Sequence, residues 1–497
     1  MKPYVNLRAI IVVISTVILP FSAEARPLQI IHTNDLHSMF ENAGRPGVGG
    51  YAALKTAIDQ IKQKATQQGI ETLVLDAGDF LEGSQLYLAG AGEHSWRMMN
   101  EMGYDAVTIG NHDWLMGDYV LDAILGYAPP KFAFLGANMI FDHSMKNLNK
   151  HIWPAAEFNK GGLKIAVLGF VTDEILYSWL FENSILVNPY ETAQVYVPRL
   201  RKKNDAVIAL SHMGLEKDMS LARKISGIDV IVGGHDHNIL VKPVYVRSPN
   251  KRDVPIVQTG NHAFFVGDLL VDIEKGQPLQ VLHYRLVPVT SKFEDDNKMA
   301  GLVKDARNQL EKDYGPDWLY EQVGYAEAPS DWSQLLVNAM LRAGKADLAI
   351  DIPDFTGIAK SEGPITREDL MSLYPRCSRL DHKFGWTVWT AKIRGWILKF
   401  AMKKVLEKGY EFGVSGLTYN LRMKNGKRII SNIRIGGKKI KWYKNYKIAL
   451  PEGIAKASIQ NEFTNIITFI IKSRRDSKIP VWTAIEKQIQ AQGGIIK

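Results

Sequence analysis

The 497-residue sequence contains a single cysteine, Cys377. One cysteine cannot close an internal disulfide, so the core rather than covalent cross-links must stabilise the fold. No histidine motif accompanies Cys377 in a recognised arrangement, and we interpret it as a buried or semi-buried side chain rather than as a nucleophile. Internal repeats and low-complexity tracts are also missing, and the 46% hydrophobic and 23% charged residues are typical of a globular protein rather than of a fibrous or disordered one.

Long apolar runs are missing as well. The apolar run at residues 9–21 is shorter than the roughly 20 residues that a bilayer span needs, which disfavours an uncleaved membrane anchor. It follows a basic start and precedes the small-x-small segment Ala23-Glu24-Ala25, so we interpret residues 1–25 as a signal peptide that is cleaved before Arg26. We therefore expect an exported protein, periplasmic or extracellular, with no transmembrane segment after cleavage.

Acidic residues are too few to balance the basic ones, which leaves a formal net charge of +9. The excess is concentrated late in the chain, at residues 424–447 and 472–478. Such a surface could steer anionic substrates, or contact nucleic acid or anionic lipid. We favour the plainer interpretation, a solvated basic face, and expect no specific nucleic-acid partner.

Five short polar segments each follow directly after an apolar run. They are Asp35-Leu36-His37, Asp76-Ala77-Gly78-Asp79, Gly110-Asn111-His112-Asp113, Ser211-His212-Met213-Gly214 and Gly233-Gly234-His235-Asp236-His237. Seven of their side chains, namely two carboxylates, one amide and four imidazoles, would make a ligand set for two divalent metal ions that share one bridging carboxylate.

The apolar runs before these segments are short, aliphatic and rich in β-branched residues, which predicts strands buried on both faces of a sheet. They lie at residues 28–33, 72–75, 105–109, 205–210 and 228–232. In an open α/β sheet, ligands bind beyond the carboxyl ends of the strands, so the five segments can converge on one site.

In this order and context, the five segments resemble those of the calcineurin-like metallophosphoesterases, specifically the two-domain 5′-nucleotidase family. The resemblance implies an α/β fold: a layered metallophosphoesterase β-sandwich flanked by helices, with a smaller α+β C-terminal domain joined by a helical linker. We place the phosphoesterase domain at residues 26–295, the linker at 296–322 and the 5′-nucleotidase-like C-terminal domain at 323–497.

Within the C-terminal domain we expect a helix at residues 391–407. Its apolar residues Ile393, Trp396, Ile397, Phe400 and Val405 would share one face, with lysines elsewhere. A basic amphipathic helix can lie on a membrane, but we favour packing of this face into the core.

By resemblance, two groups of residues would hold two divalent metal ions (Zn, Mn, Co, Fe or Mg, with the identity undetermined). The groups share Asp79 as the bridge and are Asp35, His37, Asp79 and His237 for one ion and Asp79, Asn111, His212 and His235 for the other.

The resemblance also implies a mechanism, in which a metal-bridging hydroxide attacks the phosphorus atom. His112 would be the catalytic histidine that stabilises the transition state or the leaving group. The family's aspartate three residues after this histidine is replaced here by Leu115. Either Asp113 or another group orients His112, or the histidine acts without a partner and the leaving groups must be easier ones.

Substrate contacts are expected from the C-terminal domain. Arg376 and Arg379 could bind a substrate anion, with an ordinary surface salt bridge as the alternative. Phe412 adjoins the position where the family stacks an aromatic ring on the base, but the family's Asn-Gly-Gly-x-x-Arg and Gly-Gly-Asp-Gly segments have no counterpart. We assign no role to His262.

We therefore expect an exported dinuclear-metal phosphoric ester hydrolase, 5′-nucleotidase-like, acting on a small phosphoester such as a nucleotide. Two alternatives stay open. The same metal site could act on another substrate, namely a 2′,3′-cyclic nucleotide, a UDP-sugar or a thiosulfohydrolase-type substrate, or the fold could serve a non-enzymatic surface-binding protein. Seven retained ligand residues argue against the last, because a drifting site would be expected to lose some of them.

Overall fold

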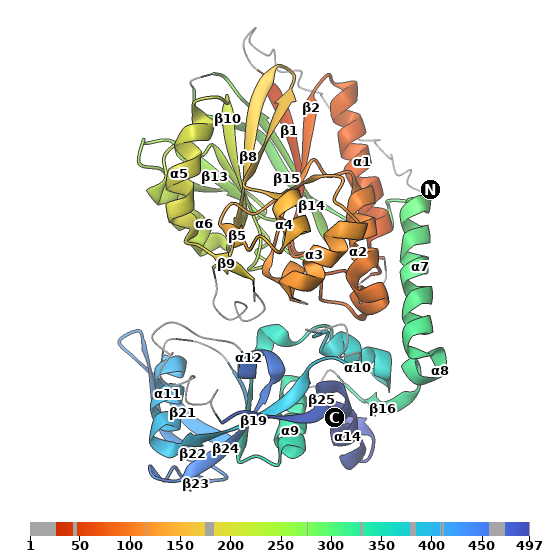
Figure 1. Cartoon of the computed structure of the whole chain (residues 1–497), viewed down its shortest axis with the longest axis vertical. Helices are drawn as coiled ribbons and strands as arrows, with labels where there is room; N and C mark the ends of the chain where they lie inside the picture. Colours follow the sequence, from red (N-terminus) through yellow and green to blue (C-terminus); the bar gives the residue numbers. More distant parts are fainter. Residues whose placement is uncertain are drawn as a thin grey trace, which may run out of the picture.

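The computed structural model describes residues 26–42, 47–115, 117–173, 183–275, 277–328, 332–377, 384–407, 409, 412–456 and 473–496. The expected signal peptide and Arg379 lie outside these residues. The chain forms two lobes, one above the other in Figure 1, and the long helix α7 (Asn297–Tyr314) runs along one side between them.

Two sheets packed face to face form the first lobe. The seven-stranded sheet has the order β15 (Gln280–Pro288), β14 (Phe265–Asp272), β1 (Pro27–Thr33), β2 (Glu71–Asp76), β3 (Ala106–Thr108), β4 (Ala133–Leu135) and β6 (Ile152–Trp153). The six-stranded sheet has the order β12 (Val244–Arg247), β13 (Asp253–Val257), β11 (Val230–Gly233), β10 (Ala206–His212), β8 (Leu163–Val171) and β7 (Ala155–Lys160).

Alternate residues of each strand fill different cores, as the period of two of a strand requires. Ile30 of β1 and Ile208 of β10 belong to the cluster between the two sheets. Ile31 of β1 faces outward to one helical layer, and Ala209 of β10 faces outward to the other. Burial on both faces explains why these strands read as continuous apolar runs.

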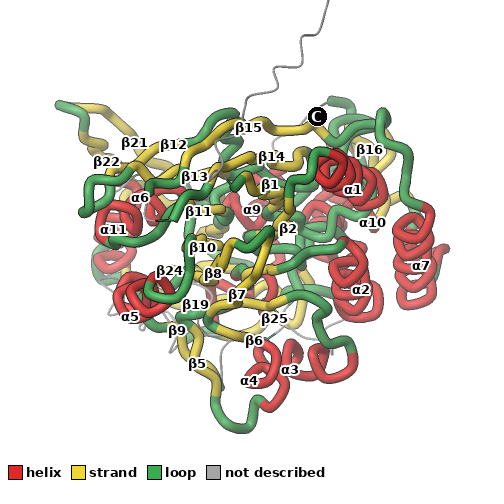
Figure 2. The backbone as a smooth tube through the Cα atoms, turned by 90° about the horizontal axis from the view of Figure 1, so that it is seen from above, coloured by secondary structure: helices red, strands yellow, loops and turns green. Residues whose placement is uncertain are grey.

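Helices cover the outer faces of both sheets. Figure 2 shows α1 and α2 on one side of the sheets and α5 and α6 on the other. The helices of this lobe are α1 (Tyr51–Gln67), α2 (Glu93–Met102), α3 (Asp118–Tyr127), α4 (Lys146–His151), α5 (Pro189–Arg201) and α6 (Leu215–Lys224). The lobe also contains the 3₁₀ segments η1 (Gln85–Gly92) and η2 (Asn111–Trp114) and the strand pair β5 (Met139–Phe141) and β9 (Ser184–Leu186). The layered α/β fold expected from the sequence is confirmed.

The second lobe is a smaller α+β unit. A five-stranded sheet has the order β20 (Gly413–Ser415), β17 (Leu348–Asp351), β24 (Asn445–Pro451), β19 (Thr387–Arg394) and β25 (Arg475–Pro480). Two three-stranded sheets contain β21 (Leu417–Lys424), β22 (Lys427–Ile435) and β23 (Lys438–Lys439), and β18 (Gly363–Thr366), β16 (Gln322–Ala326) and β26 (Ile495–Ile496). Its helices are α8 (Pro316–Leu319), α9 (Trp332–Gly344), η4 (Pro353–Phe355), α10 (Arg367–Leu373), α11 (Gly395–Glu407), α12 (Glu452–Lys456) and α14 (Val481–Ala491).

The helix expected at residues 391–407 is shorter in the structure, because its first four residues belong to β19. Gly395 marks the change: a Cβ there would lie 2.2 Å from the carbonyl oxygen of Lys441. The expected apolar face is also wrong. Ile393 is buried in the strand, whereas Trp396 and Phe400 are more than half exposed on the helix.

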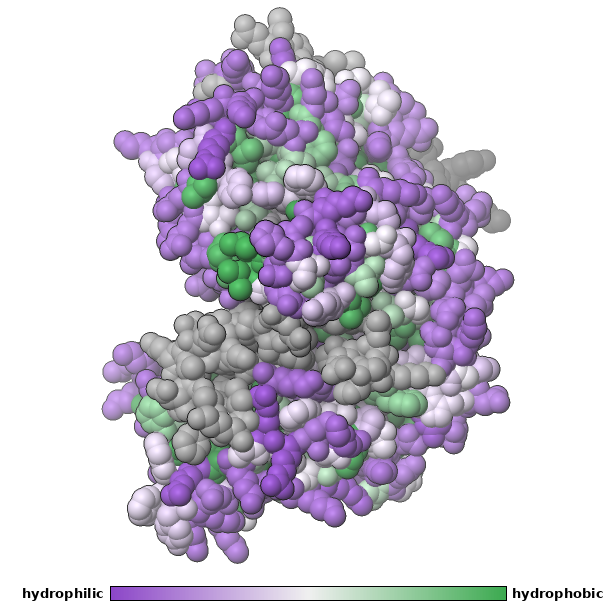
Figure 3. Space-filling view, viewed as in Figure 1, coloured by the Kyte–Doolittle hydropathy of each residue, from purple (hydrophilic) through white to green (hydrophobic). Residues whose placement is uncertain are grey.

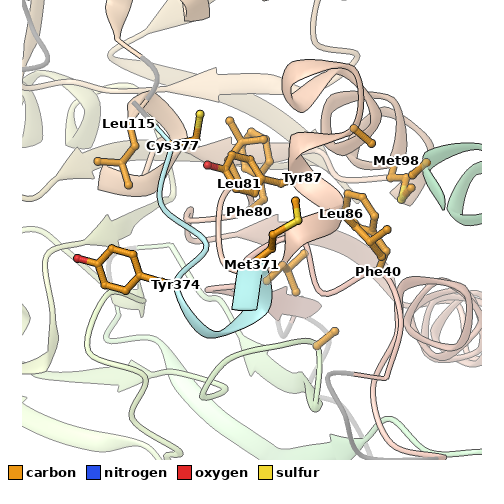
Figure 4. Packing of buried hydrophobic residues seen from close by; sticks show 14 of the residues in the cluster. Phe40, Phe80, Leu81, Leu86, Tyr87, Met98, Leu115, Met371, Tyr374 and Cys377 are labelled. Atoms are coloured by element: carbon orange, nitrogen blue, oxygen red, sulfur yellow. The ribbon is translucent and has the colours of Figure 1, made fainter. Parts of the chain in front are cut away.

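An apolar contact joins the two lobes (Figure 4). Phe80 and Tyr87 of the first lobe belong to the same buried cluster as Met371 and Tyr374 of the second. Cys377 is 5% exposed in this cluster, which confirms the expectation that it is buried. Among the described helices, none has both the length and the apolarity that a bilayer span requires.

Polar contacts border the apolar contact between the lobes. Ser372 Oγ donates a hydrogen bond to Gln85 Oε1 (2.5 Å), and Gln85 Nε2 donates to Glu368 Oε1 (2.6 Å). Arg307 on α7 pairs with Glu41 of the first lobe and with Glu368 of the second. One arginine therefore links both lobes to the helix between them.

His32 of β1 gives the first lobe a defined acid sensitivity. Its side chain is fully buried, and neither ring nitrogen has a hydrogen-bond partner among the described residues. The ring stacks on Tyr284, 6.0 Å away between centroids, in space left open because residue 267 is glycine. Burial lowers the pKa of His32 from 6.5 to about 3, so the folded state holds the ring neutral.

We predict that His32→Phe removes this sensitivity. Because the folded pKa lies below the unfolded one, the free energy of unfolding falls as the pH drops below about 6.5, and by pH 5 the loss is about 2 kcal/mol. The free energy of unfolding of the variant minus that of the parent should therefore be larger at pH 5 than at pH 8. Urea unfolding of both proteins at the two pH values measures this difference. An identical difference between the two proteins at both pH values would contradict the prediction.

Candidate metal centre

The five polar segments meet at the carboxyl ends of parallel strands from both sheets. Strands β1, β2 and β3 are parallel neighbours in one sheet, as are β10 and β11 in the other. Two contacts tie the sheets together at this edge. His212 Nδ1 donates to the carbonyl oxygen of Ala77 (2.7 Å), and the backbone N–H of His235 donates to Asp35 Oδ2 (3.0 Å).

One group of possible ligand atoms comes from Asp35, His37 and His237, whose donor atoms lie within 4.8 Å of one another. His37 Nε2 is 3.0 Å from His237 Nε2 and 3.8 Å from Asp35 Oδ1. The other ring nitrogen of His37, Nδ1, is 2.8 Å from the carbonyl oxygen of Glu82 and donates to it, which turns Nε2 toward the group.

A second group comes from Asp79, His212 and His235, again within 4.8 Å. His212 Nε2 lies 2.9 Å from Asp79 Oδ2 and 3.2 Å from Asn111 Oδ1. Since His212 Nδ1 donates to Ala77, Nε2 is the nitrogen that faces these oxygens.

Asp79 connects the two groups. Its carboxylate also lies within 4.8 Å of donor atoms of His37 and His112, and the backbone N–H of His112 donates to its Oδ1 (2.7 Å). The side chain is almost fully buried. Its position between the groups is the one that a bridging carboxylate would need.

The electrostatics of the cluster favour positive charge at its centre. Burial opposes the ionisation of Asp79, but His212 and His112 outweigh it and hold the pKa of that carboxyl well below its usual value. Burial likewise opposes protonation of His212, yet the Asp79 carboxylate raises the pKa of His212 to about 10. Divalent cations would supply the positive charge that this donor set attracts, so the residues fit two metal ions.

Strained backbone holds the cluster in place. Five of the residues that form it have φ between +51° and +87°, a left-handed conformation that non-glycine residues rarely adopt: Asp35, His37, Asp79, His235 and His237. Close packing adds to the constraint, because a Cβ at Gly110 would lie 2.1 Å from Asp79 Oδ1.

His112 is held by a carboxylate that the sequence did not reveal. Glu82 Oε2 pairs with His112 Nδ1, and Arg376 Nη1 donates to the same Oε2 (2.6 Å). Arg376 Nη1 is also 3.2 Å from His112 Nδ1, and its Nε donates to the carbonyl oxygen of Phe355 (3.0 Å). Glu82 and Arg376 are both at least 95% buried.

Asp113 does not orient His112. Its carboxylate accepts the backbone N–H groups of Gly110 (2.7 Å), Asp79 (3.0 Å) and Leu81 (3.0 Å), so it braces the loops instead. Leu115 belongs to the apolar cluster that the lobes share and is shown near Cys377 in Figure 4.

The candidate substrate-binding residues and His262 lie in different parts of the structure. The surface salt bridge weighed for Arg376 is excluded because its ion pair with Glu82 is buried. Phe412 is half-buried and packs against the core beneath α11. His262, assigned no role from the sequence, lies beside the cluster, 5.8 Å from the His37 ring between centroids, and its backbone N–H donates to the carbonyl oxygen of Asp35 (2.8 Å).

Family comparison agrees with this geometry. Residues 28–238 match the calcineurin-like phosphoesterases and residues 323–464 match the 5′-nucleotidase C-terminal domain. The chain contains a calcineurin-like phosphoesterase domain followed by a 5′-nucleotidase C-terminal domain. This pair of domains makes it a metal-dependent hydrolase.

Two relatives and one solved structure illustrate the likeness of this phosphoesterase to known proteins. It is 26% identical to the trifunctional nucleotide phosphoesterase protein YfkN of Bacillus subtilis, with 81% of the chain aligned but only 30% of that longer protein spanned. It is also 26% identical to the snake venom 5′-nucleotidase of Gloydius brevicauda, over 88% of the chain and 82% of the relative. The fold is that of a 5′-nucleotidase precursor from Thermus thermophilus, with a TM-score of 0.79 at 21% identity, covering 95% and 97% of the two chains.

We predict that Gly110→Ala disturbs this phosphoesterase centre without unfolding the lobe. The added methyl group would displace the Asp79 carboxylate, so manganese binding measured by calorimetry should weaken at least about tenfold. Gly301→Ala is the matched control, because a Cβ there, on α7, meets no atom within 4 Å. Unchanged binding in Gly110→Ala would show that the position of Asp79 is not critical.

Proposed function

We propose that the protein is an exported 5′-nucleotidase-like hydrolase of phosphoric monoesters that uses two divalent metal ions. The observation that carries this proposal is the convergence of seven donor side chains in two groups that meet at Asp79. The nucleotide substrate is supported by the names of the two relatives, a nucleotide phosphoesterase and a 5′-nucleotidase.

In this proposal the two groups hold the two ions as expected from the sequence. Asp35, His37 and His237 would hold one ion, Asn111, His212 and His235 would hold the other, and Asp79 would be the ligand that both ions share. Divalent metals in such a ligand set act as Lewis acids toward phosphoryl oxygens and generate the nucleophile from water.

His112 acts on the leaving group. Its Nε2 lies 3.9 Å from Asp79 Oδ2 and so faces the cluster, while its Nδ1 is held by Glu82. The Glu82 carboxylate on Nδ1 orients the ring, and Nε2–H of the protonated ring can donate to the departing oxygen. Glu82 thus takes the part of the aspartate that Leu115 replaces.

Arg376 acts through Glu82. Its guanidinium compensates the buried Glu82 carboxylate and fixes it from the second lobe, so the position of His112 depends on how the lobes pack. Direct substrate contacts by Arg376, Arg379 or Phe412 stay predictions.

We also propose the domain division and export that the sequence suggested: a signal peptide at 1–25, a phosphoesterase domain at 26–295, a linker at 296–322 and a C-terminal domain at 323–497. The order of elements along the chain supports this division, because α7 follows the last strand of the first lobe, β15, and precedes the first strand of the second, β16. Sequencing the N-terminus of the protein from a culture should find Arg26.

Phosphate release from the chain beginning at Arg26 tests the function. We expect the metal-free protein to be inactive and to regain turnover of nucleoside monophosphates with manganese, zinc or cobalt. Cyclic nucleotides, UDP-sugars and bis-p-nitrophenyl phosphate, assayed alongside, should be poorer substrates.

Asp79→Asn should reduce this turnover by more than about a hundredfold, because it removes the shared charge between the ions. Asp59→Asn, an exposed carboxylate paired with Lys55 on α1, is the control. Turnover of aryl esters alone would refute the nucleotidase assignment, and no turnover with any metal would refute the hydrolase mechanism.

Glu82→Gln should lower kcat for a nucleoside monophosphate by about tenfold to a hundredfold with little change in KM. The loss should be smaller with p-nitrophenyl phosphate, because p-nitrophenolate leaves without a proton. Glu368→Gln is the matched control, since Glu368 also bridges the lobes through Gln85 and Arg307. Equal losses on both substrates would assign Glu82 a structural role only.

A further inference from the structure

Positive charge is concentrated in one segment of the second lobe. Between Lys392 and Lys447 the sequence holds sixteen lysines and arginines and two glutamates, so the rest of the chain is net negative. This segment includes α11, β21, β22 and β23 and the loop from β23 to β24. Charge of one sign at this density repels itself, and so small a number of acidic residues in the segment cannot balance it.

Large apolar side chains are exposed on the same segment. Seven of the 21 exposed large hydrophobic residues found in the described chain lie here, with exposures of 38 to 70%. They are Trp396, Phe400, Leu421, Met423, Ile429, Trp442 and Tyr443. Leu421 and Met423 lie on one side of the β21–β22 hairpin, and Ile429, which pairs with Arg422, lies on the other. We call the surface formed by these seven residues and the exposed Lys399, Lys403, Lys438 and Lys439 the basic-aromatic face.

Contacts show that the parts of this face adjoin one another. The backbone N–H of Trp396 donates to the carbonyl oxygen of Trp442 (3.1 Å), which places the start of α11 beside the β23–β24 loop. At the other end of α11, Arg428 Nη1 donates to the carbonyl oxygen of Gly409 (3.3 Å). A groove lined by Glu407, Gly409 and residues 423–429 continues the surface onto the β21–β22 hairpin.

Helix α11 has apolar residues on two sides. Ile397, Leu398, Met402 and Leu406 are buried in the core of the second lobe. Trp396 and Phe400, one turn apart, point outward instead, with the exposed Lys399 and Lys403 between and after them. The four buried residues are enough to pack α11 against the core, so the fold does not require apolar side chains at the two exposed positions.

The position of the face argues against substrate steering. Strands β22 and β23 lie at the end of the second lobe that is remote from the first lobe in Figure 1. Salt screens charge over about 10 Å, so this end acts weakly on the histidine cluster. In Figure 3 hydrophilic residues dominate this end, with paler residues among them.

Two other occupants fit the face less well. In a symmetric dimer through this face, a second copy would bring its own lysines and arginines against those of the first, and the charges would repel. Nucleic acid would use the positive charge and stack on aromatic rings, but it offers nothing to Leu421, Met423 and Ile429 at the hairpin.

We propose that the basic-aromatic face docks the protein on a membrane surface that contains anionic phospholipid. Lysines and arginines would contact the headgroup phosphates, and the tryptophans and aliphatic side chains would enter the interfacial region, as in other peripheral membrane proteins. The proposal concerns a binding surface and does not depend on the proposed catalytic activity.

Co-sedimentation with vesicles tests it, using the chain that begins at Arg26, so that residues 1–25 cannot contribute. The protein should bind vesicles of phosphatidylglycerol and phosphatidylcholine and not vesicles of phosphatidylcholine alone, and the binding should weaken as salt rises. Each lysine near an anionic surface contributes about fivefold to binding. Lys438→Glu/Lys439→Glu should therefore weaken binding by at least about twenty-five-fold.

Matched controls separate the face from general charge and hydrophobicity. Lys202→Glu/Lys203→Glu makes the same change at two exposed lysines beside α5 and should bind almost as the parent does. Trp396→Ala/Phe400→Ala should weaken binding, whereas Trp153→Ala/Tyr127→Ala, exposed aromatics of the first lobe, should not. Circular dichroism and turnover in solution should match the parent in all four variants.

Three outcomes would overturn the proposal. One is no binding to anionic vesicles, and another is equal weakening by the face variants and their controls. The third is binding to a single-stranded oligonucleotide that depends on these residues while vesicle binding does not, which would make nucleic acid the partner.

Discussion

Burial of the Asp79 carboxylate is the constraint on which the rest of the site depends. A buried charge must be compensated by hydrogen bonds and opposite charge, and Asp79 obtains these from the His112 backbone N–H and from His212 Nε2. Those partners come from the turn η2, which follows β3, and from the end of β10, and these two strands belong to different sheets. The two sheets must therefore pack in one register for a single carboxylate to be satisfied.

The second lobe contributes to the same site through one ion pair. Removing one partner of a buried ion pair leaves an uncompensated charge, which lowers the free energy of unfolding by about 3 to 5 kcal/mol. Glu82 and Arg376 therefore favour a single relative orientation of the two lobes. The apolar cluster around Tyr87 and Met371 supplies the area of the contact, while the ion pair fixes its geometry. The same pair sets the orientation of His112, so lobe packing and leaving-group chemistry are coupled through three side chains.

The sequence was informative where local pattern determines position. Each of the five polar segments follows a strand that is buried on both faces, and the ends of parallel strands must meet, so the convergence of Asp35, Asp79 and His235 could be predicted. Glu82 could not be predicted in this way, because it lies outside the five segments and its partner Arg376 is 294 residues away in sequence. Such a pair depends on how the two lobes pack, and the periodicity of apolar residues in the sequence does not indicate how lobes pack.

Helix α11 shows a second limit. An apolar pattern at helical spacing indicates a face but not which neighbour covers it, and here the residues from Ile397 to Leu406 that pack inward differ from the outward pair Trp396 and Phe400. The predicted apolar face was wrong because α11 has apolar residues on both sides. In addition, the first four residues of the expected helix belong to strand β19. A helix that satisfies its core with one set of residues and still exposes two large aromatic rings between lysines carries more apolar surface than its fold needs. That excess, and not the total charge, is what distinguishes a binding face from a solvated one.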